Sequence, residues 1–288
     1  MVDQFVAQGY SVSDACTAAG MSRSTYYRQR SLPSDLISSS PATDERLREQ
    51  ICRICATHPF WGYRRVTAWL RYREATWVNH KKVLRLMQEA GLTVKQKPRP
   101  ALEKQQPAKP RAERPNQYWG IDMTKFMIPT LGWAYLVIVL DWYTKRIVGW
   151  DLALRSRAQE WKQVLEQAVL AEFPDGVKGQ GLNLISDNGT QPTAVSFMQA
   201  TTTLEINQIF TTYNNPKGNA ETERMMRTIK EEVLWLQEFT SLQQAQEVIK
   251  NWIAVDYHQQ YVHSALGYQS PAEFEQQFYQ QQSLRVAA

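Results

Sequence analysis

The sequence predicts an α/β domain, with a mixed five-stranded sheet and flanking helices, that follows two all-α helix-turn-helix units. Three observations support this fold class. From residue 115 onward, runs rich in β-branched and aromatic residues replace helical periodicity. Three such runs follow one another and later ones alternate with helical segments, an order typical of a sheet covered by helices. Before residue 95, short helical segments with polar first residues and glycines at their ends succeed one another.

Residues 1–31 are expected to form the first helix-turn-helix unit. Helices are predicted over residues 3–8, 14–19 and 23–30. Ser13 and Ser22 stand where N-caps of the second and third helices belong, and glycines end the first two. The third helix would present polar and basic side chains to the major groove of DNA, although a plain helical hairpin is the alternative. The side chains expected to contact DNA are Arg23, Ser24, Arg28 and Arg30.

A second helical unit is expected over residues 43–94, after a Ser/Pro-rich linker. Thr43 and Asn79 are the expected N-caps of its first and last helices. Helices are predicted over residues 45–56, 62–73 and 80–90. Residues 61–94 hold seven basic and two acidic side chains, a balance that favours contacts with DNA phosphates. The side chains expected to make these contacts are Arg64, Arg65, Lys81, Lys82 and Arg85.

Residues 95–115 are interpreted as a basic, proline-rich linker. Residues 95–114 carry seven basic residues, two acidic ones and four prolines, with no apolar periodicity. Such a segment cannot bury enough apolar surface to order itself. It is expected to lie semi-extended along DNA, and an inert linker is an equally good interpretation.

The α/β domain is predicted over residues 116–239, with a helical extension over residues 240–288. Strands are predicted over residues 118–128, 133–142, 146–154, 182–185 and 206–211. Helices are predicted over residues 159–173 and 192–203, and a further helix is expected to begin near Asn219, its N-cap. The first three strands form a meander, and the others alternate with the helices.

The charge distribution separates the two halves of the chain. Residues 1–114 carry 20 basic and 10 acidic side chains, a net charge of +10, whereas residues 115–288 carry 13 and 18, a net charge of −5. This asymmetry indicates DNA binding upstream and carboxylate chemistry downstream. The alternative is that the basic residues only solubilise helices.

The composition predicts a cytoplasmic, nucleoid-associated protein. No apolar run approaches the roughly 20 residues of a membrane helix, and no signal-peptide pattern opens the chain. The three cysteines, Cys16, Cys52 and Cys55, are an odd number with no disulfide framework. Cys52, Cys55 and His58 have the spacing of zinc ligands, but no second pair follows, so reduced thiols on helices are favoured.

Three carboxylates lie where separate elements of the predicted domain can bring them together. Asp122 lies within the first strand, Asp187 directly follows the fourth, and Glu223 lies in the helix after the fifth. Carboxylates suit hard divalent cations, and paired metals drive phosphodiester chemistry. Thirty-five residues separate Asp187 from Glu223, but an Asp–Glu pair at such a spacing also arises by chance. Asp141 and Asp151, at strand ends, are interpreted as structural.

Several motifs occur together and in order. They are residues 119–124, 133–141, 147–150, 186–189, 216–223, 228–232 and 263–271. In these motifs the chain resembles the retroviral-integrase-type, or DDE, catalytic core of insertion-sequence transposases, specifically the OrfB-type proteins of the IS-three family. The resemblance extends over residues 46–275. Relatives commonly have His where this chain has Ile185.

The resemblance implies an RNase H-like core and a DNA transposase. It implies that Asp122, Asp187 and Glu223 are catalytic and hold two Mg²⁺ or Mn²⁺ ions per active site. The family's reaction is cleavage at the terminal inverted repeats of the element, followed by strand transfer to target DNA through a 3′-hydroxyl. A homo-oligomer on DNA is expected from the family, and a protein from an upstream reading frame is a possible partner.

Two basic residues follow Glu223 on the expected helix face. Arg227 and Lys230 lie four and seven residues after it. In integrase-type enzymes a lysine at the second position contacts DNA, and both residues are therefore expected to bind DNA. An ordinary Glu–Arg pair on the helix surface is the alternative for Arg227. For the whole chain, two other functions remain: a nuclease of the same fold that hydrolyses without joining, and a non-catalytic DNA-binding regulator.

Overall fold

The computed structural model describes residues 2–23, 26–27, 41–94, 110–211 and 218–286. The chain divides into two compact units, residues 1–57 and 58–288. No helix among the described residues is both long enough and apolar enough to cross a membrane.

The first unit opens with two short helices, α1 (Val2–Ala7) and α2 (Val12–Ala18). A small apolar cluster joins them; its buried members are Val2, Ala15, Cys16 and Tyr26. The predicted cap Ser13 is wrong, because Ser11 caps α2 by accepting a hydrogen bond from the Asp14 backbone N–H at 3.1 Å. Of the predicted third helix, only residues 23, 26 and 27 lie within the described residues.

The first unit ends with α4 (Pro41–Thr57). It begins earlier than predicted, so Thr43 lies inside the helix and is not its cap. Proline is well suited to a first turn, where the backbone N–H has no partner within the helix. The three cysteines are free thiols, and burial, followed by the neighbouring Cys52, raises the pKa of Cys55 to about 11.

The second unit opens with two helices that confirm the prediction for this segment, α5 (Tyr63–Tyr72) and α6 (His80–Glu89). Asn79 caps α6 as expected, accepting a hydrogen bond from the Lys81 backbone N–H at 2.9 Å. The apolar side chains that both helices bury are Val66, Leu70, Val83, Leu86 and Met87.

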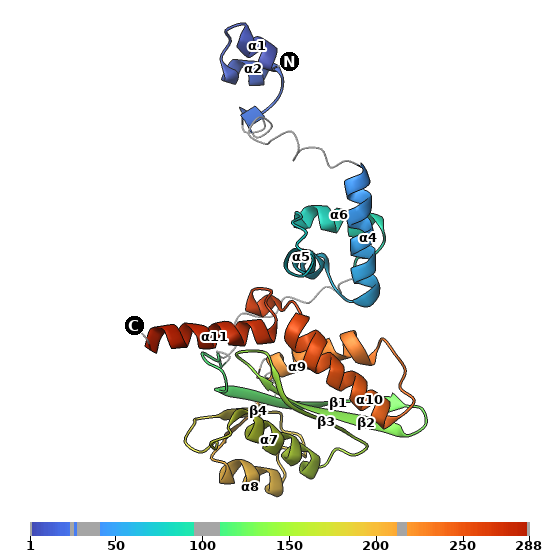
Figure 1. Ribbon diagram of the computed structural model, residues 1–288, viewed down its shortest axis with the longest axis vertical. Coiled ribbons are helices and arrows are strands. Elements are labelled where there is room, and N and C mark those ends of the chain that lie inside the picture. Colours follow the sequence, from blue (N-terminus) through green and yellow to red (C-terminus); the bar gives the residue numbers. More distant parts are fainter. Residues whose placement is uncertain (1, 24–25, 28–40, 95–109, 212–217, 287–288) are drawn as a thin grey trace. The chain divides into compact units, whose positions relative to one another are not determined.

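A five-stranded mixed sheet forms the centre of this unit (Figure 1), as the sequence predicts. Its strands are β1 (Tyr118–Ile128), β2 (Gly132–Asp141), β3 (Ile147–Ala153), β4 (Asn183–Ser186) and β5 (Asn207–Phe210). Their order is β3-β2-β1-β4-β5; β1 pairs antiparallel to β2 and parallel to β4. Two parallel strands, β4 and β5, therefore follow the meander in the sheet, and their carboxyl ends lie at the same edge.

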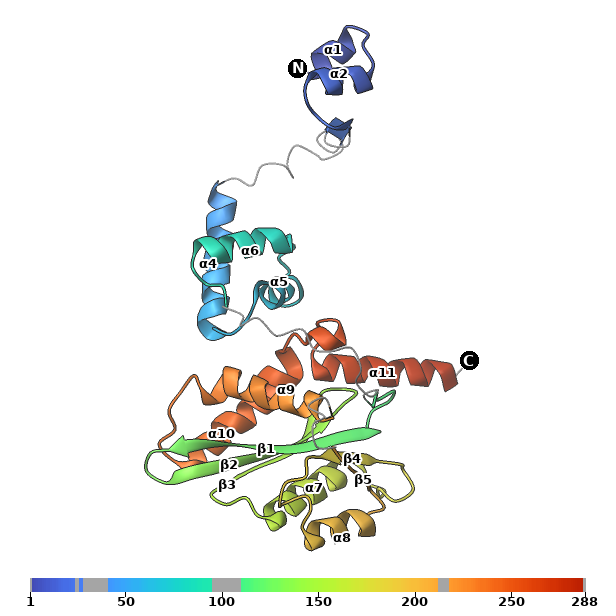
Figure 2. The ribbon, with the colours of Figure 1, turned by 180° about the vertical axis from the view of Figure 1, so that it is seen from behind.

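Helices cover both faces of the sheet (Figures 1 and 2). On one face lie α7 (Ala158–Glu172) and α8 (Val195–Thr203), which pack on an apolar core that includes Ile121, Val139 and Trp161. The other face carries α9 (Ala220–Ile229), α10 (Leu242–Asn251) and α11 (Pro271–Val286). A short π-helix, Lys230–Leu234, continues α9, and a second one, Trp252–Gln260, continues α10.

Side chains from the second π-helix and α10 cover the outer edge of β3. The backbone N–H of Ile147 donates to His258 Nε2 at 3.1 Å, and Gln246 Nε2 donates to the Leu152 carbonyl at 3.1 Å. An uncovered edge strand offers unpaired backbone groups to other chains. The C-terminal helices therefore cover this edge of the sheet.

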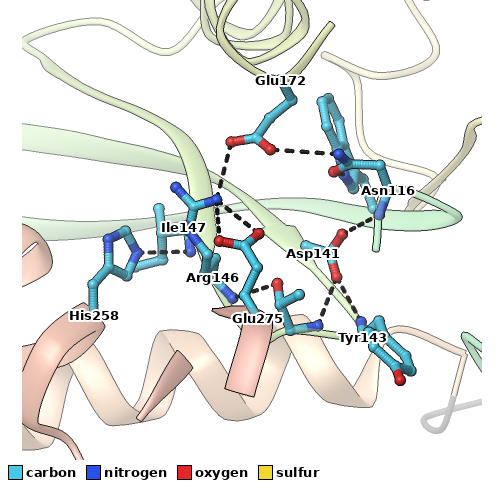
Figure 3. Close-up of polar contacts among 10 residues, drawn as sticks. Asn116, Asp141, Tyr143, Arg146, Ile147, Glu172, His258 and Glu275 are labelled. Carbon is cyan, nitrogen blue, oxygen red and sulfur yellow. Dashed lines mark hydrogen bonds and ion pairs between the residues drawn. The ribbon is translucent and has the colours of Figure 1, made fainter. Parts of the chain in front are cut away.

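Asp141 closes the turn between β2 and β3 (Figure 3). Its carboxylate accepts backbone N–H groups of Asn116 at 2.5 Å, Tyr143 at 2.7 Å and Thr144 at 2.8 Å. Asp141 is 1% exposed, so water cannot take its place as the acceptor of these N–H groups. The structural interpretation of Asp141 follows from these contacts.

An ion-pair network lies beside this turn (Figure 3). The Arg146 guanidinium contacts Glu275 of α11 at 2.9 Å and Glu172 of α7 at 3.4 Å. Glu172 Oε2 also accepts a hydrogen bond from the side chain of Asn116 at 3.4 Å. Helices from both faces of the sheet are thus tied to one residue at the start of β3.

Two buried histidines are expected to contribute a loss of stability to the second unit as the pH falls below about 6.5. Burial, followed by the charge of Arg146, lowers the pKa of His258 from 6.5 to about 4, and burial, followed by Lys145, lowers that of His263 to about 3. The unfolded chain therefore binds more protons, and stability that is complete above pH 6.5 is lost as the pH falls toward 4. Urea unfolding at several pH values measures how the free energy of unfolding changes with pH. Each histidine can contribute at most about 1.4 kcal/mol per pH unit to this slope.

The variant His258→Gln isolates one of these contributions, because its amide oxygen can still accept the Ile147 N–H but cannot titrate. As the pH falls from about 6.5 to 4, its unfolding free energy should fall less than that of wild type. Identical slopes for wild type and variant would contradict a neutral, buried His258.

Candidate active site

Asp122 lies in the middle of β1, on the face that α9 covers. It pairs with Ile138 of β2, and its Oδ1 accepts the backbone N–H of Met123 at 2.7 Å. Burial raises the pKa of Asp122 to about 6, although the Met123 N–H opposes this shift. The negative charges of Asp187 and Glu223 raise the pKa further, and Lys230 lowers it. Asp187, Glu223 and Lys230 are therefore close enough to Asp122 for their charges to act on its pKa.

The strand register explains how Asp187 reaches Asp122. In the parallel pair of β1 and β4, Gly120 is the partner of Ile185. Asp122 and Asp187 each follow these partners by two residues, so they lie at the same level of the sheet. Asp187 is exposed and accepts the backbone N–H of Gly189 at 3.0 Å, which shapes the turn after β4. A Cβ at residue 189 would lie 2.9 Å from Asp187 Oδ1, so glycine suits this position.

Glu223 is exposed in the first turn of α9. Asn219 occupies the N-cap position, as predicted, but its side chain makes no capping hydrogen bond. The segment before it, interpreted from sequence as a loop over residues 212–218, lies mostly outside the described residues. α9 itself contacts β1, the strand that carries Asp122.

The three carboxylates offer only oxygen ligands, the kind that Mg²⁺ and Mn²⁺ prefer. Within the part of the chain that the structure describes, no three His, Cys, Asp or Glu side chains are close enough to hold a metal ion. A bound cation would offset the burial and the two negative neighbours that disfavour the ionised form of Asp122.

Comparisons with known proteins match the same regions. Family models described as "Integrase core domain" match residues 112–216 and 204–271, and one described as "HTH-like domain" matches residues 42–100. The "Insertion element IS600 uncharacterized 31 kDa protein" of Shigella sonnei is 30% identical, over 92% of this chain and 98% of that protein. The chain belongs to the IS-three family of insertion-element transposases.

Two further similarities are weaker in identity. The "Putative transposase InsK for insertion sequence element IS150" of Escherichia coli K12 is 28% identical, over 94% of this chain and 96% of its own length. The catalytic core domain of BIV integrase is 15% identical with a TM-score of 0.42, over 58% of this chain and 99% of that domain.

In this transposase, the segment that carries Arg227 and Lys230 departs from a regular α-helix. Arg227 pairs with Glu231 at 2.6 Å, not with Glu223 as in the ordinary helix-pair interpretation. Lys230 lies at the junction where α9 passes into the π-helix, and it acts on the pKa of Asp122. π-Turns inside helices occur frequently at functional sites.

The residues predicted to bind DNA differ in their surroundings. Arg64 and Lys81 are exposed, whereas Arg65 lies over the rings of Trp61 and Tyr261, 5.6 Å and 5.0 Å from their centroids. Arg65 therefore contributes to packing.

The remaining predicted contacts are only partly described. Lys82 is half-buried, Arg85 pairs with Glu89 at 2.8 Å, and Arg23 is exposed. Ser24, Arg28 and Arg30 lie outside the described residues.

Two sets of contacts in this transposase have no signal in the sequence. Glu232 of the first π-helix accepts hydrogen bonds from Trp61 Nε1 at 2.6 Å and pairs with His58 Nδ1 at 2.8 Å. The second set joins Gly120 of β1 to Thr222 of α9. Both connect residues far apart in sequence, and neither forms a recognisable spacing.

Proposed function

We propose that this transposase cleaves DNA at the ends of its insertion sequence and joins the 3′-hydroxyl ends to target DNA. The observation that carries the proposal is the electrostatic grouping of Asp122, Asp187 and Glu223. The family shown by the comparisons supports a DNA substrate. The chain is expected to act in the cytoplasm, on the nucleoid, as a homo-oligomer that holds both ends, with an upstream-frame protein as a possible partner.

Asp122, Asp187 and Glu223 would hold two Mg²⁺ or Mn²⁺ ions. The chemistry that ions held there would supply is a lower pKa for an attacking water or 3′-hydroxyl and stabilisation of the leaving oxygen. Asp122 belongs to β1 and Asp187 directly follows β4, so these two would set the position of the site, and Glu223 would complete it from α9. Lys230 and Arg227 would contact the DNA backbone beside the carboxylates, and Lys230 would also reduce their mutual repulsion.

The test uses labelled DNA that carries the ends of the element, with the full chain and Mg²⁺ or Mn²⁺. The proposal predicts cleaved ends and joined products, both abolished by a chelator. Cleaved ends without joined products would support the nuclease function instead. Binding of the ends without either product, under both metals, would support the regulator function.

Exposed basic residues of the HTH-like segment are expected to bind phosphates without reading sequence. The variant Lys81→Ala should weaken binding to end DNA and to unrelated DNA equally. Each lost phosphate contact lowers the slope of log affinity against log salt by about 0.9. Fluorescence anisotropy over a range of salt concentrations measures this slope.

Lys162→Ala is the matched control, because Lys162 is a lysine of α7 paired with Glu166 at 3.6 Å on the opposite side of the sheet from α9. It should leave the affinity and the slope unchanged. Equal slopes for Lys81→Ala and wild type would remove Lys81 from the DNA interface.

A further inference from the structure

The strand that carries Asp122 and the helix that carries Glu223 meet at a glycine. Gly120 lies on the same face of β1 as Asp122, two residues earlier, and Thr222 directly precedes Glu223. A Cβ at residue 120 would lie 1.9 Å from Thr222 Oγ1 and 2.5 Å from Trp142 Nε1. Because both of those side chains are buried, neither can swing away into solvent. Only glycine therefore allows α9 this close approach to β1.

Hydrogen bonds hold the same turn of α9 against the β2–β3 turn. Trp142 Nε1 donates to Thr222 Oγ1 at 3.1 Å, and the Trp142 backbone N–H donates to the Tyr118 carbonyl of β1 at 2.9 Å. The preceding residue, Glu221, accepts from Lys145 Nζ at 2.8 Å, and Lys145 also donates to the Trp142 carbonyl. The two residues directly before Glu223 are thus fixed to the sheet by different partners.

We infer that Gly120, Thr222, Trp142 and the Lys145–Glu221 pair are positioning residues, which set the distance between Glu223 and Asp122. The inference rests on the proposed function. Glu223 itself is exposed, and no three carboxylates of the described chain have the spacing of a metal site. The position of its helix backbone therefore decides whether its side chain can reach the ligands on β1 and β4. Displacements of about 1 Å in such sites can cost 100-fold in rate.

Gly120→Ala tests the inference, with Gly149→Ala as the matched control. Gly149 is also a close-contact glycine of the sheet, where a Cβ would lie 2.8 Å from Ala168 Cβ and 2.9 Å from the Val164 carbonyl. Its contact is with α7, on the other face. Three quantities are measured for each full-length variant: the single-turnover rate of strand transfer at saturating DNA, the affinity for end DNA, and the rise in melting temperature on adding Mn²⁺.

Gly120→Ala should lower the single-turnover rate on the order of 100-fold and remove most of the Mn²⁺-dependent rise in melting temperature, with DNA affinity unchanged. Gly149→Ala should lower the melting temperature measured without metal about as much as Gly120→Ala does. At a temperature where it is folded, however, it should keep the wild-type rate and the wild-type Mn²⁺ response. Adding Thr222→Ala to Gly120→Ala removes the closest clashing atom and should restore part of the rate.

A second pair of variants applies if Gly120→Ala does not fold. Glu221→Gln keeps the shape of Glu221 but removes its ion pair with Lys145, and Glu275→Gln does the same for the pair with Arg146. Only Glu221→Gln should lower the rate and the Mn²⁺ response.

Two outcomes separate failure of the inference from failure of the proposed function. The first outcome is that wild type joins DNA, but a test variant and its matched control lose rate and Mn²⁺ response equally. The contact is then structural only, and the inference is overturned. If wild type joins no DNA, the proposed function fails. The Mn²⁺ response of Gly120→Ala, compared with that of Gly149→Ala, then still decides whether this contact positions the carboxylates.

Discussion

Replacing Asp122 by asparagine is expected to lower the rate of DNA strand transfer by at least about 10³-fold. Even residues that only support a metal ligand cost 10- to 100-fold when mutated, so loss of a ligand should cost more. Asparagine keeps the shape of the side chain but not its charge. Single-turnover joining of end DNA with Mg²⁺ measures the effect, and binding of the same DNA should be unchanged.

Asp151→Asn is the matched control for this prediction. Asp151 is also a strand aspartate, but it pairs with Val137 and therefore lies on the opposite face from Asp122. Its variant should join DNA at a rate close to wild type. Similar rates for Asp122→Asn and Asp151→Asn would remove Asp122 from the active site.

The same substitution should leave the fold intact or stabilise it slightly. Burial and two negative neighbours raise the pKa of Asp122 to about 6, so its ionised form is held against its preference. A neutral asparagine removes that repulsion and can still accept the Met123 N–H. Loss of activity together with an unchanged or higher melting temperature is the usual signature of a site in which function opposes stability.

Replacing Asp141 by alanine should have the largest effect on stability, a loss of about 3 kcal/mol or more. The change removes the acceptor of three backbone N–H groups at a residue that is 1% exposed. Each buried group left without a partner costs roughly 1–3 kcal/mol. Urea unfolding followed by circular dichroism measures the change.

Asp141→Asn is the comparison for this effect, because it keeps the volume and one acceptor oxygen. It should destabilise the protein less than Asp141→Ala does. If Asp141→Ala lost no more than about 1 kcal/mol, the three N–H groups would have found other partners, and the role of Asp141 in closing the turn would be wrong.

The sheet could be predicted from the sequence because its signals are local. The first strand occupies residues 118–128, as alternating and β-branched residues predict, and the face of α7 that packs on the sheet follows from helical periodicity. The resemblance to an integrase-type core predicts that Asp122 and Asp187 lie at one site, and the strand that carries Asp122 does pair with the strand before Asp187. Helix caps were less predictable, because Ser11 and Ser13 are equally suitable by residue type.

The supports of the site could not be predicted. Gly120 reads in the sequence as an ordinary strand glycine, and its role depends on how closely α9, a hundred residues later, approaches β1. The Lys145–Glu221 pair and the π-helix after Lys230 also arise only from tertiary packing. Sequence patterns identify which side chains do chemistry, whereas the distances between them depend on contacts between elements.

The central claim is that Asp122, Asp187 and Glu223 together hold the metal ions of the reaction. The most direct test is a titration of Mn²⁺ into the full chain bound to end DNA, in which electron paramagnetic resonance measures the free ion. We expect about two bound ions per active site for wild type, and weaker or incomplete binding for Asp187→Asn. Equal Mn²⁺ binding by the two proteins would contradict the claim.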